Sequence, residues 1–261
     1  MNVPKKKNVY LIQGVAAGYA RWALRVSNMK TSAILLYLSF DTNCDGCLFY
    51  PNSNYASGLN ILVRKAMALT IPIKYIIYSD GDINMRCKIG GKIVQSETCW
   101  VYWNNYVIDN EKEWYINPKT WWDTEGDVSK YGTCLEPATT AILKEKVPLI
   151  YPIPEYNIEK SWWLNIHARW RVAEACFPNE FLSTDKFHIY NEKHMSYPRG
   201  KELTDILDIM KNDYKKLYPY TKGEKLKHNC KITTKQKLNC EKALLERYTL
   251  WYNDSKLATN Y

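Results

Sequence analysis

Apolar runs alternate with amphipathic stretches over the first 82 residues of the chain. Apolar runs at 9–12, 33–40 and 73–78 read as strands, and the second is nearly continuous, as expected for a strand covered on both faces. Between them, 19–29 and 58–69 have helical periodicity. The order β-α-β-α-β predicts a parallel sheet with right-handed crossovers, and therefore an α/β fold of the nucleotide-binding kind.

The pattern changes after this point. Residues 83–94 alternate and turn at Gly90-Gly91, which predicts a hairpin. The aromatic stretch 100–122 reads as strand-like, and 137–146 reads as helical. We further expect an extended apolar run at 148–154, helices at 159–177, 202–217 and 234–252, and a short strand at 187–190.

Composition and charge exclude several classes of protein. Of 261 residues, 46% are hydrophobic and 24% charged, which is typical of a globular chain. No apolar run approaches the roughly 18 residues of a membrane span, and the N-terminus lacks the apolar core of a signal peptide, so we expect a soluble, intracellular protein. Ten Lys between 211 and 242 against three acidic residues favour a solvated helical segment. Nucleic acid, anionic membrane or acidic glycan are alternative partners for it, but few aromatic residues interleave the lysines, which disfavours nucleic acid.

The cysteines and aromatic residues leave alternatives open. Eight Cys are spread along the chain, and Cys44 and Cys47 form the only CxxC. Without a secretory signal we expect free thiols, with a Cys44–Cys47 disulfide or half of a metal site as the alternatives. Ten Trp and 21 Tyr suit stacking on sugars, and they suit a large core equally well.

Polar residues follow the first three predicted strands. Gly14, Asp41 and the pair Asp80 and Asp82 all fall just past strand ends, which meet at one edge of a parallel sheet. The two carboxylates of Asp80-Gly81-Asp82 can approach one divalent cation, and Mg²⁺ and Mn²⁺ prefer such oxygen ligands. A plain polar turn is the alternative for this triplet, since Asp-Gly is a favoured turn pair.

The stretches 55–60 and 75–82, ending in Asp80-Gly81-Asp82, resemble the DxD region of GT-A fold glycosyltransferases. The resemblance covers roughly residues 8 to 200 and lies in the order of the elements more than in the motif itself. It implies a GT-A (Rossmann-like) central, mostly parallel sheet flanked by helices. It also implies a catalytic domain over 1–200, with a nucleotide-sugar half (1–95) and an acceptor half (96–200), followed by a basic helical C-terminal appendage over 201–261.

The resemblance also implies roles for individual residues near the nucleotide. In that family the DxD holds Mn²⁺ or Mg²⁺ against the diphosphate of a nucleotide sugar. Asp82 would then be the principal metal ligand, and Asp80 would contact the metal or the ribose. Gly14 would lie against the nucleotide and Asp41 would bond the base or ribose. Arg64, or its neighbour Lys65, would face phosphate, with a solvent-facing helix position as the alternative.

The second half would supply the acceptor site. Glu159 precedes an aromatic pair at a predicted helix start, so we nominate it as the general base, with Trp162 and Trp163 stacking on the acceptor. The alternative is that Glu159 merely favours the helix N-terminus and that both Trp are core residues. Rival bases are Glu155, Asp127 and Glu136.

A late loop offers the remaining ligands. Enzymes of this family often complete the metal shell with a His in such a loop, and His194 fits that position. Arg199, five residues on, would bind the charge of the diphosphate. We expect His188 to pack inside its strand instead.

The expected function is therefore a metal-dependent glycosyltransferase, a hexosyl- or pentosyltransferase of glycan biosynthesis. It would move a monosaccharide from a nucleotide diphosphate sugar, with UDP as the expected nucleotide, to a hydroxyl of a glycan or glycoprotein, preferably with inversion. Compact relatives of this type build capsid glycans of large algal viruses, some adding xylose, which suggests UDP-xylose and a viral enzyme in the host cytoplasm. A metal-dependent nuclease or phosphotransferase and a non-catalytic carbohydrate-binding protein are the alternatives. A homodimer through the basic segment is one option for assembly.

Overall fold

The computed structural model describes residues 5–111, 113–120, 138–153, 155, 176–177, 180, 182–190 and 233–254. The strands are β1 (Lys7–Gly14), β2 (Ala33–Ser39), β3 (Leu48–Phe49), β4 (Ile73–Asp80), β5 (Asn84–Ile89), β6 (Lys92–Gln95), β7 (Tyr115–Thr120), β8 (Thr139–Leu143) and β9 (Leu182–Tyr190). The helices are α1 (Tyr19–Asn28), α2 (Tyr55–Met67), α3 (Thr98–Asp109) and α6 (Thr234–Asn253), with short 3-10 turns η1 (Ala16–Gly18), η2 (Lys30–Ser32) and η4 (Lys144–Leu149).

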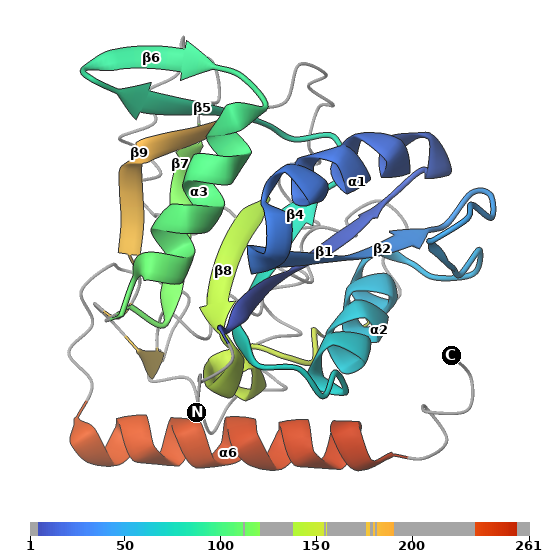
Figure 1. Cartoon of the computed structure of the whole chain (residues 1–261). Coiled ribbons are helices and arrows are strands. Elements are labelled where there is room, and N and C mark those ends of the chain that lie inside the picture. The colour runs from blue at the N-terminus through green and yellow to red at the C-terminus, as the bar shows by residue number, and fades with distance from the viewer. Residues whose placement is uncertain are drawn as a thin grey trace, which may run out of the picture.

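The strands form one sheet in the order β3-β2-β1-β4-β8-β7-β9-β5-β6 (Figure 1). The first four are parallel, as the β-α-β-α-β pattern predicted. Beyond β4 the pairing is mixed, because β8 runs antiparallel to both β4 and β7, β7 is parallel to β9, and β5 is antiparallel to β9 and β6. The α/β class is confirmed, whereas the sheet as a whole is mixed: its first four strands are all parallel, and beyond β4 the only parallel pair among the described strands is β7 with β9.

Helices cover both faces of the sheet. Alternate residues of β1 show this division, since Val9 and Leu11 pack with α2 and α6, and Tyr10 and Ile12 pack with α1 and α3. This explains why the central strands are apolar at nearly every position, as expected for strands buried on two sides. Figure 1 shows α1 and α3 on one face and α6 running past the end of the sheet at which β1 begins.

The stretch after the hairpin is a helix and not the strand that its aromatic residues suggested. Within α3, Cys99, Trp100, Trp103 and Val107 are buried. Their spacing of three and four residues places them on one helical stripe. Aromatic side chains fit a pleated surface well, and this preference favours a strand by residue type. Here the stripe of buried residues favours a helix instead. The strand follows later, as β7, and contains Pro118.

Residues 137–146 do not form the helix that their pattern predicts. Their described part is β8 followed by η4. Thr139, Thr140 and Ile142 are β-branched, and β8 fills the place between β4 and β7. The predicted hairpin is confirmed as β5 and β6, with Gly90 and Gly91 at φ of 55° and 79° in its turn.

The remaining predictions are confirmed for β9 and α6, the first of which is longer than expected. The predicted helix at 159–177 lies almost entirely outside the described residues, and the one at 202–217 lies outside them altogether. None of the helices in the described ranges is long and apolar enough to cross a membrane.

Helix α6 is fastened to the core of the sheet domain. Cys240 and Leu244 are buried in the cluster that contains α2, and Lys237 forms an ion pair with Glu180. Cys240 is also disulfide-bonded to Cys176. The C-terminal helix therefore packs as part of the main core, although it was expected as an appendage.

Two disulfides correct the expectation of free thiols. Cys44 is bonded to Cys47 within the loop after β2, and Cys176 to Cys240 across 64 residues of sequence. Cys87 and Cys99 are buried and unbonded.

Candidate functional site

The carboxyl ends of β1, β2 and β4 lie side by side. Gly14 pairs with Ser39 on β2, and Gln13 pairs with Asp80 on β4. This register brings Gly14, Asp41 and the acid loop, defined as Asp80-Gly81-Asp82, to one edge of the sheet. Ligands of open parallel sheets bind at this edge, so it is the candidate site.

Two glycines allow the acid loop to lie against the end of β1. A methyl group placed on Gly81 would lie 2.9 Å from the carbonyl oxygen of Gln13 and 3.4 Å from Cα of Gly14. The first contact is with backbone, which cannot move aside cheaply. The close approach of the two strand ends therefore requires glycine at position 81.

Asp80 accepts two hydrogen bonds from tyrosine hydroxyls. Both the Tyr55 and the Tyr78 hydroxyl donate to its Oδ1. The two rings meet nearly at right angles, with an interplanar angle of 88° and centroids 6.0 Å apart. Tyr55 opens α2 and Tyr78 lies on β4, so this carboxylate is aimed by two elements at once.

Burial raises the pKa of Asp80 from 3.8 to about 7, and the nearby charge of Asp82 adds to the rise, while the two tyrosine hydroxyls counteract it. Among the described residues, no basic side chain forms an ion pair with Asp80. Asp82 is exposed, and its charge acts on both Asp80 and Arg21. The acid loop thus places a half-buried and an exposed carboxylate close enough for the charge of Asp82 to raise the pKa of Asp80.

Helix α1 hydrogen-bonds the backbone of the acid loop. Arg21 Nη2 and Trp22 Nε1 both donate to the carbonyl oxygen of Gly81, at 2.5 and 2.9 Å. Because this carbonyl accepts two donors from one helix, the backbone of the acid loop is fixed relative to α1.

Arg25, one turn further on, fixes the residues that follow the loop. Its guanidinium donates to the Ile83 carbonyl and to Asn84 Oδ1, each at 3.1 Å. It lies over the rings of Trp22 and Trp100, with 4.7 and 5.0 Å to the centroids. This buried arginine therefore positions the acid loop without facing the edge of the sheet.

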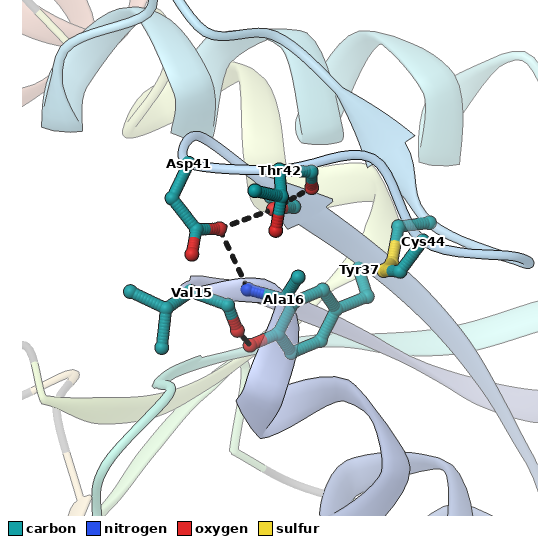
Figure 2. The surroundings of a disulfide bond; sticks show 8 residues. Val15, Ala16, Tyr37, Asp41, Thr42 and Cys44 are labelled. Atoms are coloured by element: carbon teal, nitrogen blue, oxygen red, sulfur yellow. Dashed lines mark hydrogen bonds between the residues drawn. A yellow bond between two sulfur atoms is a disulfide. The ribbon is translucent and has the colours of Figure 1, made fainter.

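Asp41 joins two loops of the edge (Figure 2). Its Oδ1 accepts the Ala16 N–H at 2.7 Å and the Ser39 hydroxyl at 2.8 Å, and these hydrogen bonds lower the pKa of Asp41. Beside it, the Tyr37 hydroxyl donates to the Val15 carbonyl at 2.7 Å. Asp41 therefore shapes the end of β1, and both of these hydrogen bonds are accepted by Oδ1.

Arg64 is not part of this edge, which corrects its expected phosphate contact. Tyr55 at the start of α2 hydrogen-bonds Asp80, and Arg64 lies nine residues further along the helix, about 13.5 Å from Tyr55 at roughly 1.5 Å per residue. Its guanidinium donates to the carbonyls of Trp251 and Tyr252 at the end of α6, at 2.5 and 3.1 Å. Lys65 beside it is exposed. Arg64 therefore helps to hold α6.

Several predicted site residues lie outside the described ranges. They are Glu159, Trp162, Trp163, His194, Arg199, and the rival bases Asp127 and Glu136. Glu155 is described, and its Oε1 accepts a hydrogen bond from the buried Asn60 at 2.8 Å. His188 is half-buried in β9, with Nε2 3.0 Å from the Asp185 carbonyl oxygen.

The donor set of the acid loop fits a hard divalent cation in kind, because it consists of carboxylate oxygens. It is incomplete in number, since the described residues contain no group of three or more His, Cys, Asp or Glu that could hold a metal ion. Further ligands would have to come from a bound diphosphate, from water or from residues outside the described ranges.

The acids of the candidate site stand out in the sequence, whereas the residues that hold them do not. Tyr55 and Tyr78 are 23 residues apart, and nothing in their spacing indicates a shared carboxylate. Arg25 carried a usable signal, because it stands on the apolar stripe of α1 with Trp22 and Val26. A charged residue on such a stripe must find partners in the core.

The sequence matches no protein-family model and no curated protein.

Proposed function

We propose that the chain is a metal-dependent glycosyltransferase that uses a nucleotide diphosphate sugar, with UDP as the nucleotide, and transfers the sugar to a hydroxyl of a glycan. The observation that carries this proposal is the half-buried carboxylate of Asp80, whose pKa is raised to about 7. It lies at the carboxyl edge of the parallel strands, next to Asp82 and without a basic partner among the described residues. Holding such a carboxylate costs folding free energy, and functional sites are where such costs are retained.

In this proposal Asp82 and Asp80 hold Mn²⁺ or Mg²⁺. The cation would offset the negative charge that develops on the departing diphosphate. The tyrosine hydroxyls of residues 55 and 78 keep Asp80 oriented, so that only its remaining lone pairs face the ligand. The α1 side chains Arg21 and Trp22 hold the Gly81 carbonyl, which fixes the direction of both carboxylates.

The nucleotide would lie over the ends of β1 and β2. Gly14 lets the end of β1 pack closely beside the Tyr37 side chain, because a methyl group placed there would meet the Tyr37 hydroxyl at 2.8 Å. Asp41 holds the neighbouring turn through Ala16 and would offer Oδ2 to a ribose or base. The general base and the acceptor platform, for which Glu159 and the Trp162-Trp163 pair remain the proposal, lie outside the described residues.

The alternative of a carbohydrate-binding module finds less support. Such a module needs exposed aromatic faces, but Trp22, Trp100 and Trp103 are at most 1% exposed, and Trp114 is 7% exposed. Trp22, Trp100 and Trp103 belong to the core cluster next to the acid loop, and Trp114 belongs to the cluster on the other face of the sheet. These four tryptophans are therefore accounted for by packing.

Calorimetric titration with a panel of UDP-sugars, with and without Mn²⁺, tests the proposal. We expect binding of at least one donor that weakens roughly tenfold or more when Mn²⁺ is chelated or when Asp82 is replaced by Ala. Asp109→Ala, an exposed acid at the end of α3, is the matched control and should bind like the parent chain. Absence of heat with every donor, or sugar binding indifferent to both EDTA and Asp82→Ala, would contradict the proposal.

A further inference from the structure

Cys87 and Cys99 meet in the core between β5 and α3. Cys87 lies on β5, and Cys99 lies in the first turn of α3. Their Sγ atoms are 2.6 Å apart, well inside the roughly 3.5–4.0 Å at which non-bonded heavy atoms touch. The two sulfur atoms therefore lie closer than unbonded atoms do, and about 0.5 Å beyond the length of a disulfide bond.

The pairing repeats across the described cysteines. Cys44 meets Cys47, and Cys176 meets Cys240, with Cα separations of 5.3 and 6.1 Å, both within the usual disulfide range. Every cysteine in the described ranges thus has another cysteine as its partner. Free thiols behave as small apolar side chains and have no reason to meet in pairs.

We propose that Cys87 and Cys99 form a third disulfide, made while the chain folds in the presence of a disulfide oxidant. The thiolate of one cysteine attacks the oxidant's S–S bond to give a mixed disulfide, which the second cysteine then breaks. Two thiol S–H bonds are lost and one S–S bond forms. The two electrons and two protons reduce the oxidant to two thiols.

The bond forms before α3 closes over β5. In the folded chain Cys87 is 2% exposed and Cys99 is fully buried, so neither can reach an oxidant. Burial also raises the pKa of the Cys87 thiol to about 12, which leaves almost no thiolate in the folded protein. The same burial shields the finished bond from reductants.

The proposed disulfide lies close to the residues that hold the acid loop in place. Cys99 is two residues from Glu97, which binds Arg25, and Arg25 in turn holds the Ile83 carbonyl. The bond would thus pin the start of α3, with Glu97, to the sheet. It does not depend on the proposed glycosyltransferase activity.

Peptide mapping of the refolded chain tests the assignment. Full-length protein is reduced, unfolded, and refolded in a buffer with oxidised glutathione in excess, then unfolded again with an alkylating agent and no reductant. Trypsin should release the dipeptide Cys87-Lys88 linked to the peptide 93–112, which contains Cys99. Alkylation of both cysteines, or linkage of either to a different cysteine, would overturn the proposal.

A double variant, compared with the parent chain, measures the effect of the bond on stability. Cys87→Val combined with Cys99→Ala keeps the site apolar and removes the bond, and it should lower the melting temperature of the refolded protein by roughly 5–10 °C. After reduction in denaturant and refolding with reductant present, parent and variant should melt within about 2 °C of each other. A parent chain that melts equally in both refolding buffers would contradict the cross-link, even if the variant fails to fold.

Discussion

Arg25 on α1 and Glu97, the residue before α3, form a two-point ion pair whose halves lie in different surroundings. The arginine side chain is 1% exposed and the glutamate side chain 52% exposed. Nη2 donates to Oε1 at 2.7 Å, Nε donates to Oε2, and the remaining donors hold the chain after the acid loop. The pair therefore ties two helices together directly beneath the candidate site.

Because Arg25 is buried and Glu97 is exposed, replacing each residue should lower the free energy of unfolding by a different amount. Glu97→Ala leaves a buried guanidinium without its counter-charge, so we expect about 3 kcal/mol of lost stability. Arg25→Met keeps an apolar side chain between Trp22 and Trp100. It leaves Glu97 without its ion-pair partner, but water can solvate this exposed carboxylate, so we expect a loss of about 1–2 kcal/mol of stability. Urea unfolding of both variants measures the difference. A larger loss for Arg25→Met than for Glu97→Ala would contradict this account.

A second prediction concerns Asp80→Asn and pH. Because burial raises the pKa of Asp80 from 3.8 to about 7, the folded chain holds a proton that the unfolded chain releases between these values. Folding free energy therefore becomes less favourable as pH rises through about 4 to 7, and the full deficit is present above pH 7. Asn removes the charge, so the variant should be more stable than the parent at pH 8, by up to about 4 kcal/mol.

The comparison is made by urea unfolding at pH 8 and pH 4, where the gain should vanish. Asp109→Asn, an exposed acid, is the control and should gain little at either pH. Under the proposed function Asp80→Asn should also weaken Mn²⁺-dependent donor binding, so stability and binding should change in opposite directions. An Asp80→Asn chain less stable than the parent at pH 8 would show that this carboxylate serves the fold.

The tyrosines give a third prediction. Their hydroxyls lower the pKa of Asp80, against the larger effect of burial. Tyr55→Phe removes one donor and should move the titration of Asp80 to higher pH, which carbon NMR of the carboxyl group follows directly. Tyr102→Phe, at an exposed position on α3, should leave this titration unchanged. If Tyr55→Phe alters stability alone and not the titration, the hydroxyl has only a packing role.

The first half of the fold could be predicted because its signals are local. Each early strand is a compact apolar run, and each ends at Gly14, Asp41 or the acid loop, so the strand ends that make up the site could be read from the sequence. Parallel neighbours then follow from the order of the elements. The convergence of these residues at one edge needed no knowledge of side-chain contacts.

The later elements could not be assigned in the same way, because their patterns have two interpretations. Trp100 and Trp103 favour a strand by residue type and a helix by spacing, and packing against α1 selects the helix. The residues that hold the acid loop could not be predicted for a related reason. The contact of Arg25 with Glu97 spans 72 residues, so no local pattern contains it.

The last prediction separates Arg64 from the candidate site. Its guanidinium lies 4.5 Å from the centroid of the Trp251 ring and donates to two carbonyls at the end of α6, where a cation also favours the helix dipole. Arg64→Ala should therefore cost about 1–3 kcal/mol by urea unfolding, and it should leave donor affinity unchanged within about twofold, because α2 carries residue 64 away from Asp80. Lys65→Ala, next to it and exposed, should change neither quantity. If Arg64→Ala weakened donor binding while stability was preserved, the guanidinium would have to reach the nucleotide, and the present position of α6 would be excluded.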